Sequence, residues 1–284
     1  MFPNTPAKSA SGQDTESLDL NGNARAAEAS GLSGGPFAFG CRHELKYRVS
    51  EQQAAGIAQF IRPFLQPDSY CKLQPGGSYP ITTLYLDSQD LLLCRQSLEG
   101  QKNRCKLRIR SYTDEPDYPR YVEIKRRMNA IIIKSRARIM DRDIPALLAG
   151  RALEPQAYTT DTETISQFQL YVNSLRARPM VLVRYMRQAY EDSTHREVRV
   201  TFDRQLAYNV TNLPEVRLGG RGWQPHANML GRVVLEIKFT GHYPAWLTHM
   251  ARYFDLQQQS LSKYASSIGE SCLLKFCAPQ AAVY

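Results

Sequence analysis

The most constraining feature of this sequence is a set of short segments in which charged and apolar residues alternate. Every second residue of Lys106-Leu107-Arg108-Ile109-Arg110 is a cation, and Lys134, Arg136 and Arg138 repeat the pattern within 131–139. Because successive strand side chains point to opposite faces, each segment predicts a strand with one charged face and one mostly apolar face. Seven predicted strands share this property, at 42–49, 104–112, 121–126, 131–139, 180–190, 195–204 and 233–239, and 79–86 predicts a further strand.

An ordinary antiparallel sheet would turn these charged faces to water. Surface faces usually mix the two signs, however, and here cations dominate; like charges directly opposite each other across strands are destabilising. Such rows are tolerable if an anion binds between them or if carboxylates compensate. Glu44, Glu123 and Glu236 are placed to compensate, and they are also of the type that holds a divalent cation.

Several segments predict amphipathic helices that need an apolar surface to cover. They lie at 50–62, 88–98, 163–177 and 244–254, the first opened by the Ser50/Gln53 capping signature, and further helices are expected at 143–149 and 264–276. The outer face of the sheet can supply that surface if the sheet closes. The prediction is therefore an α+β fold: a closed antiparallel β-barrel with a polar lumen and amphipathic helices packed outside.

The charge balance points to an anionic partner. Lys and Arg number 36 against 27 Asp and Glu, a net charge of +9, and residues 101–140 alone hold twelve cations against four carboxylates. Nucleic acid, nucleotides, polyphosphate and acidic lipid are the candidate classes. No RNP or KH signature supports nucleic acid, so that partner is not expected.

Composition also divides the chain. Residues 1–36 are rich in Ser, Gly, Asn and Ala and predict a disordered tail, which leaves 37–284 as a single domain.

The longest apolar runs are too short for a membrane span, and no signal-peptide core is present. Six cysteines lack metal-binding spacing and are expected to be reduced thiols. The expected location is the cytoplasm.

Nine short motifs in a fixed order resemble a known family. They are Glu44-Leu45-Lys46-Tyr47, Leu84-Tyr85-Leu86-Asp87-Ser88, Lys106-Leu107-Arg108-Ile109-Arg110, Glu123-Ile124-Lys125, Ile133-Lys134-Ser135-Arg136, Tyr185-Met186-Arg187-Gln188-Ala189-Tyr190, Arg199-Val200-Thr201-Phe202-Asp203, Leu235-Glu236-Ile237-Lys238 and Leu261-Ser262-Lys263-Tyr264. The series is similar to the VTC domain, the polyphosphate polymerase module of the vacuolar transporter chaperone complex and its bacterial relatives. That domain belongs to the triphosphate tunnel metalloenzymes, alongside the CYTH phosphatases.

The resemblance implies a tunnel in which the terminal phosphate of ATP is transferred to a polyphosphate chain with Mn²⁺ or Mg²⁺. By motif position, it implies phosphate-binding catalytic cations at Lys46, Arg108, Arg110, Lys125, Lys134, Arg187 and Lys263. Further substrate-binding residues are expected at Arg136, Arg199, Lys238 and Ser262. Glu236 is the metal ligand that the family implies, with Glu44 and Glu123 as additional candidates.

Two positions depart from related patterns. Arg42 stands where CYTH enzymes carry the first of two glutamates, which argues against a CYTH-type cyclase or thiamine triphosphatase and suits the VTC branch. Ser260 replaces a basic residue that is common in the VTC branch. Neither an SPX domain nor a membrane segment is found, so a membrane partner would be a separate protein. Two alternatives stay open: a triphosphatase acting on inorganic triphosphate or nucleotides, and a non-catalytic polyphosphate-binding module.

Overall fold

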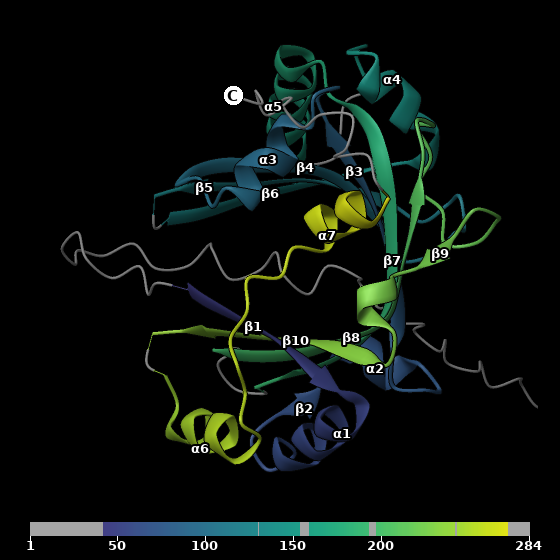
Figure 1. Ribbon diagram of the computed structural model, residues 1–284. Coiled ribbons are helices and arrows are strands. Elements are labelled where there is room, and N and C mark those ends of the chain that lie inside the picture. Colours follow the sequence, from purple (N-terminus) through teal and green to yellow (C-terminus); the bar gives the residue numbers. More distant parts are fainter. Residues whose placement is uncertain (1–41, 130, 154–158, 193–196, 242, 272–284) are drawn as a thin grey trace, which may run out of the picture. The chain divides into compact units, whose positions relative to one another are not determined.

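The alternating segments form one antiparallel sheet in the computed structural model (Figure 1). The structure describes residues 42–129, 131–153, 159–192, 197–241 and 243–271, all within one compact unit, Gly40–Tyr284. The strands are β1 (Arg42–Ser50), β2 (Gln66–Pro67), β3 (Tyr79–Asp87), β4 (Asn103–Ser111), β5 (Arg120–Met128), β6 (Ile131–Ile139), β7 (Arg178–Glu191), β8 (Val198–Val210), β9 (Gln224–Pro225) and β10 (Arg232–Thr240). The tail expected at 1–36 lies outside the described residues, and the single domain over 37–284 stays a prediction.

The expected closed barrel is wrong. The main strand order is β1-β10-β8-β7-β3-β4-β5-β6, so that β1 and β6 are the two margins of an open sheet among the described residues. The outer edge of β1 is instead occupied by the segment that runs from α6 to α7, through a bridge between Tyr47 and Gln258 and a 2.9 Å hydrogen bond from the Gln259 N–H to the Lys46 carbonyl. Among the described residues, β1 and β6 share no backbone ladder.

Seven α-helices are described: α1 (Glu51–Phe60), α2 (Ser69–Leu73), α3 (Leu92–Leu98), α4 (Ile144–Leu148), α5 (Thr159–Leu175), α6 (Ala245–Tyr253) and α7 (Lys263–Glu270). Two 3₁₀ turns, η1 (Asp141–Asp143) and η2 (Ala227–Met229), complete the elements. The predicted capping box at Ser50 and Gln53 is present at the start of α1. The helix expected at 264–276 is described only as far as Glu270, and its last residues lie outside the described part.

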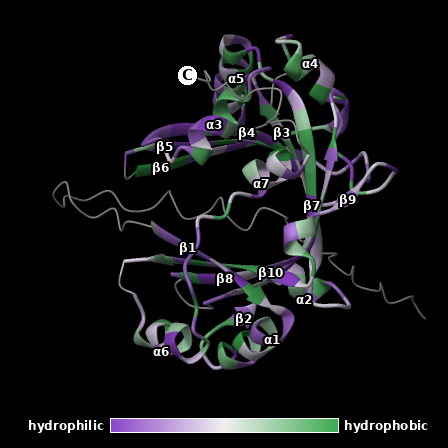
Figure 2. Cartoon of the chain, in the orientation of Figure 1, coloured by the Kyte–Doolittle hydropathy of each residue, from purple (hydrophilic) through white to green (hydrophobic). Residues whose placement is uncertain are grey.

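The apolar strand faces are covered by helices, as the sequence predicts. On one part of the sheet, Leu235 and Ile237 of β10 pack with Ile57 of α1 and Leu247 of α6. On the other part, the apolar residues of β4, β5 and β6 form a second buried cluster with α4 and α5, including Phe168. Because these two clusters cover the apolar faces, the charged side chains that alternate with them along the strands lie on the opposite, inner face. Figure 2 shows the alternation of hydrophilic and hydrophobic residues along the strands.

Helix α7 is an exception to the expected arrangement of helices outside the sheet. The Tyr264 ring stacks on Tyr85 of β3 with ring centroids 4.8 Å apart, and the Tyr264 hydroxyl donates a 2.7 Å hydrogen bond to Asp87. Since Tyr85 lies opposite Arg108 in the β3–β4 ladder, α7 packs on the same face as the cations. Figure 1 shows this helix lying between the two halves of the curved sheet. No helix among the described residues is long and apolar enough to cross a bilayer.

Candidate functional site

The cationic strand faces predicted from the sequence converge on the inner side of the sheet. In the β4–β5–β6 ladders, Arg108 lies opposite Glu123, which lies opposite Arg136. The neighbouring row aligns Lys106, Lys125 and Lys134 in the same way. Register alone therefore places like charges side by side, an arrangement that is unfavourable without a compensating anion.

Glu123 of β5 neutralises one group of these cations. Its fully buried carboxylate lies 2.6 Å from Arg108 Nε and 2.9 Å from Lys134 Nζ, with Arg110 and Arg136 at 3.7 and 3.6 Å. Burial alone would raise the pKa of this carboxyl, but the four cations outweigh burial and hold its pKa well below the usual range. Glu123 is thus a permanent internal counter-ion for four of the predicted phosphate-binding residues.

Asp203 of β8 is the counter-ion of a second group, and the sequence analysis did not select it. Arg187 of β7 donates one hydrogen bond to each of its oxygens, at 2.7 Å to Oδ1 and 2.8 Å to Oδ2, and Lys263 at the start of α7 lies 2.6 Å from Oδ2 as well. Asp203 is buried, which opposes ionisation, yet the two cations keep its pKa below the usual value. Its position two residues beyond Thr201 on the charged face was the available signal.

Glu44 and Glu236 form a third group on β1 and β10. Glu44 lies 2.7 Å from Lys46 and 3.0 Å from Lys125, and Glu236 pairs with Lys238. Burial and the neighbouring Glu236 charge both act to raise the pKa of Glu44, but the lysines lower it to about 2. Two ionised carboxylates are therefore held close together on the inner face.

Lys106 is a further inner-face cation that the sequence analysis left out of the candidate site. Its Nζ donates a 2.9 Å hydrogen bond to the Ser262 hydroxyl, which also accepts from the Ala265 N–H and so caps α7. Burial, together with Lys46 and Lys125, lowers the pKa of Lys106 to about 7. Its place in the alternation with Arg108 and Arg110 could have identified it.

Arg199 is a predicted site residue whose guanidinium group is paired with carboxylates outside the three groups described above. Its guanidinium lies 2.6 Å from Asp68, the residue that caps α2, and 2.6 Å from Glu191 of β7. Two carboxylates therefore already bind this side chain, whereas most of the other predicted cations share one carboxylate with another cation. The structure brings the other predicted site residues together on the inner face and places Arg199 beside them.

The carboxylates of the inner face differ in how well they could bind a divalent cation. Among the described residues, no three His, Cys, Asp or Glu side chains gather into a metal-binding cluster. Glu44 and Glu236 fit the simpler case in which the protein supplies two carboxylates and the rest of the coordination comes from phosphate and water, as Mg²⁺ often requires. Glu123 fits poorly, because four cations already lie within 3.7 Å of its carboxylate, whereas in the described part of the chain Glu44 has two such ion-pair partners and Glu236 has one.

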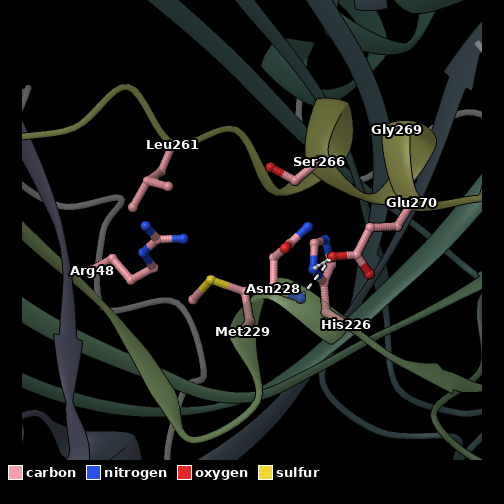
Figure 3. Close-up of a pocket in the computed structure, with 8 residues that line it drawn as sticks. All are labelled: Arg48, His226, Asn228, Met229, Leu261, Ser266, Gly269 and Glu270. Carbon is pink, nitrogen blue, oxygen red and sulfur yellow. Dashed lines mark hydrogen bonds and ion pairs between the residues drawn. The ribbon is translucent and has the colours of Figure 1, made fainter.

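A separate cavity of about 370 Å³ lies between β1, η2 and α7 (Figure 3). Its lining includes Arg48, and His226 paired with Glu270 over 2.6 Å. Glu270 also accepts hydrogen bonds from the N–H groups of Ala227 and Asn228. This pair ties the end of α7 to η2, and none of the predicted site residues lines the cavity.

The fold and site together define an α+β protein whose antiparallel sheet turns a strongly cationic face inward around buried carboxylates. The family model for the VTC domain matches residues 41–271, and the chain belongs to this family. No protein of curated function matches the chain in sequence.

Three solved structures show weak likeness. A candidate adenylate cyclase from Bacillus halodurans is 15% identical, with a TM-score of 0.41, over 78% of this chain and 95% of that one. A protein from Pyrococcus horikoshii OT3 is 11% identical, with a TM-score of 0.39, over 81% and 99%. A Mimivirus capping enzyme triphosphatase is 9% identical, with a TM-score of 0.25, over 75% and 87%. At these scores the likenesses establish neither a shared fold nor an activity.

Proposed function

We propose that this protein is an ATP-dependent polyphosphate polymerase that transfers the terminal phosphate of ATP to a polyphosphate chain on its inner cationic face. The observation that carries the proposal is the convergence of cations from six strands and from α7 around a smaller set of buried or half-buried carboxylates. The cations are Lys46, Lys106, Arg108, Arg110, Lys125, Lys134, Arg136, Arg187, Lys238 and Lys263, and the carboxylates are Glu44, Glu123, Asp203 and Glu236. Membership of the VTC domain family supports the same function.

The excess of positive charge is suited to phosphoryl transfer, which depends mostly on positioning and on charge stabilisation. Arg108, Arg110 and Arg187 are largely buried and are held by carboxylates, so their guanidinium groups are oriented before substrate arrives. Planar guanidinium groups match phosphate oxygens in pairs, and lysines act as mobile point charges. The acceptor is a phosphate oxyanion that is already deprotonated, so no general base is required.

Glu44 and Glu236 are the residues that would hold Mn²⁺ or Mg²⁺ in this proposal. A bound divalent cation would supply neutralisation of phosphate charge beyond what the lysines provide. These carboxylates form ion pairs with Lys46, Lys125 and Lys238 in the structure. A bound phosphate chain would give the same lysines other anions to pair with, which would leave the carboxylates available to the metal. Substrate and metal binding are therefore expected to reinforce each other.

The proposal is tested by incubating the purified protein with ATP and Mn²⁺ and resolving the products on a gel. Long polyphosphate chains are expected. Release of orthophosphate alone would identify a triphosphatase, and binding of ATP or polyphosphate without turnover would identify a binding module; both results overturn the polymerase. Arg252→Ala, which removes an exposed cation from α6, is the matched control for variants of the inner face.

A further inference from the structure

The hairpin of β5 and β6 ends in exposed apolar side chains. Ile131 is 65% exposed, Met128 52%, Ile132 44% and Ile133 37%. β6 is a margin of the sheet among the described residues, and the free end of the hairpin projects beyond α3 (Figures 1 and 2). A group of large apolar residues at the end of an edge strand marks a surface that another body covers.

Arginines accompany these apolar residues on both faces of the hairpin. Arg127 lies opposite Ile132 and Arg126 opposite Ile133, while Arg104 of β4 lies directly opposite Arg127. Arg104 donates to the Gln101 carbonyl and Arg127 to the Asn129 carbonyl, and the Nε of Arg126 is buried without a hydrogen-bond partner. None of these contacts is to a carboxylate, in contrast to the cations deeper on the inner face.

We propose that the end of the β5–β6 hairpin docks on an anionic lipid surface, with its isoleucines among the acyl chains and its arginines at the headgroups. Interfacial membrane binding needs exposed apolar area combined with basic residues, because the apolar side chains enter the bilayer boundary while cations attract acidic lipid. Met128 and Ile131 supply apolar contact at the tip, and the arginines flank them. The hairpin binds the surface without spanning the bilayer.

A second copy of the chain is a poorer occupant of this surface. Pairing of two β6 edges would bring Lys134, Arg136 and Arg138 of one copy beside the same residues of the other. Like charges placed opposite each other across strands oppose such pairing. An acidic lipid surface, in contrast, complements every exposed charge on the hairpin.

The test is co-sedimentation of the full chain with vesicles of phosphatidylcholine alone or mixed with phosphatidylglycerol. Binding is expected only to the mixed vesicles. The triple variant Ile131→Ser/Ile132→Ser/Ile133→Ser should weaken it by about tenfold or more, and Arg127→Gln by about fivefold. Leu230→Ser is the matched control, because Leu230 is exposed to the same 65% as Ile131 but lies outside the hairpin, and it should bind normally.

Three results would overturn the proposal. Absence of binding to either vesicle would leave the hairpin as a docking surface for a protein, and equal binding to both would remove the role of the arginines. Unchanged binding of the triple isoleucine variant would assign the interaction to the cationic inner face instead. Circular dichroism and the thermal midpoint of each variant establish that a loss of binding is not a loss of fold.

Discussion

Lys125 of β5 donates a 3.0 Å hydrogen bond to Glu44 of β1, so that a side chain from one side of the open sheet reaches the margin strand of the other. The two strands share no backbone ladder. Lys106 and Ser262 make a second contact of this kind, between β4 and the start of α7. The inner face is enclosed by side chains where a barrel would be enclosed by main-chain hydrogen bonds.

The Lys125–Glu44 contact is expected to stabilise the enclosure only modestly. Both side chains are partly exposed, so a double-mutant cycle with Lys125→Met and Glu44→Gln should give a coupling energy of about 0.5–1 kcal/mol by chemical denaturation. A coupling near zero would mean that other contacts hold the two sides of the sheet together. The Arg204–Glu51 pair on the outside of the fold serves as a comparison cycle.

Glu123→Gln should destabilise the fold strongly. The substitution leaves Arg108 and Arg110 buried without their counter-ion, and breaking a buried pair in this way costs about 3–5 kcal/mol. Polyphosphate should raise the thermal midpoint of the variant more than that of the parent protein, because the added anion replaces the missing charge. Equal shifts in the two proteins would contradict anion binding at this group, and Glu163→Gln on the exposed side of α5 is the control.

Arg108→Ala should lower turnover by about a hundredfold or more while the protein stays folded. Loss of one preorganised donor to the developing charge typically has this effect. Glu123 keeps Lys134, Arg110 and Arg136 nearby, so its charge stays compensated. Steady-state kinetics with Arg252→Ala as control provides the measurement, and parental turnover in the variant would exclude Arg108 from the reaction.

Glu236→Gln should raise the concentration of Mn²⁺ that half-maximal activity requires. The variant keeps the side chains that surround position 236. Of the two proposed metal ligands, however, Glu44 is then the one that remains an ionised carboxylate. Activity measured over a metal titration gives the shift, and Glu51→Gln on α1 is the control for loss of a glutamate charge. An unchanged metal requirement would show that the metal binds without Glu236.

Polyphosphate affinity should fall as the pH rises through about 7. Lys106 has its pKa lowered to about 7, so it is charged below that pH and neutral above it, and a bound polyanion favours the charged form. The internal phosphates of a long chain do not titrate in this range, so the ligand itself cannot produce the trend. Calorimetry in two buffers should reveal proton uptake on binding above pH 7, which Lys106→Met should reduce; the remainder is expected from Lys134, whose pKa burial lowers to about 8.

The strands and their charged faces are predictable from sequence because a period of two residues is a local property. Lys134 and Arg136 could be assigned to one face without knowing their neighbours, and the register then brought them to Glu123. Closure was not predictable, because it depends on which remote segment occupies the edge of β1. The sequence of α7 is amphipathic, which suits a helix on either face of the sheet. The Tyr264–Asp87 and Lys263–Asp203 contacts place it on the inner face, and these depend on the tertiary structure.

If the inner face binds polyphosphate as proposed, the open margin of the sheet affects how this long linear polymer reaches it. A continuous ring of backbone would oblige the chain to thread through from a free end. Here the margin beside β1 carries the segment between α6 and α7, and its side-chain link to β5 is the Lys125–Glu44 ion pair, which can part and re-form without unfolding a strand. In the proposed function, parting of this ion pair and of the short Tyr47–Gln258 contact would let an internal stretch of polyphosphate enter and leave from the side.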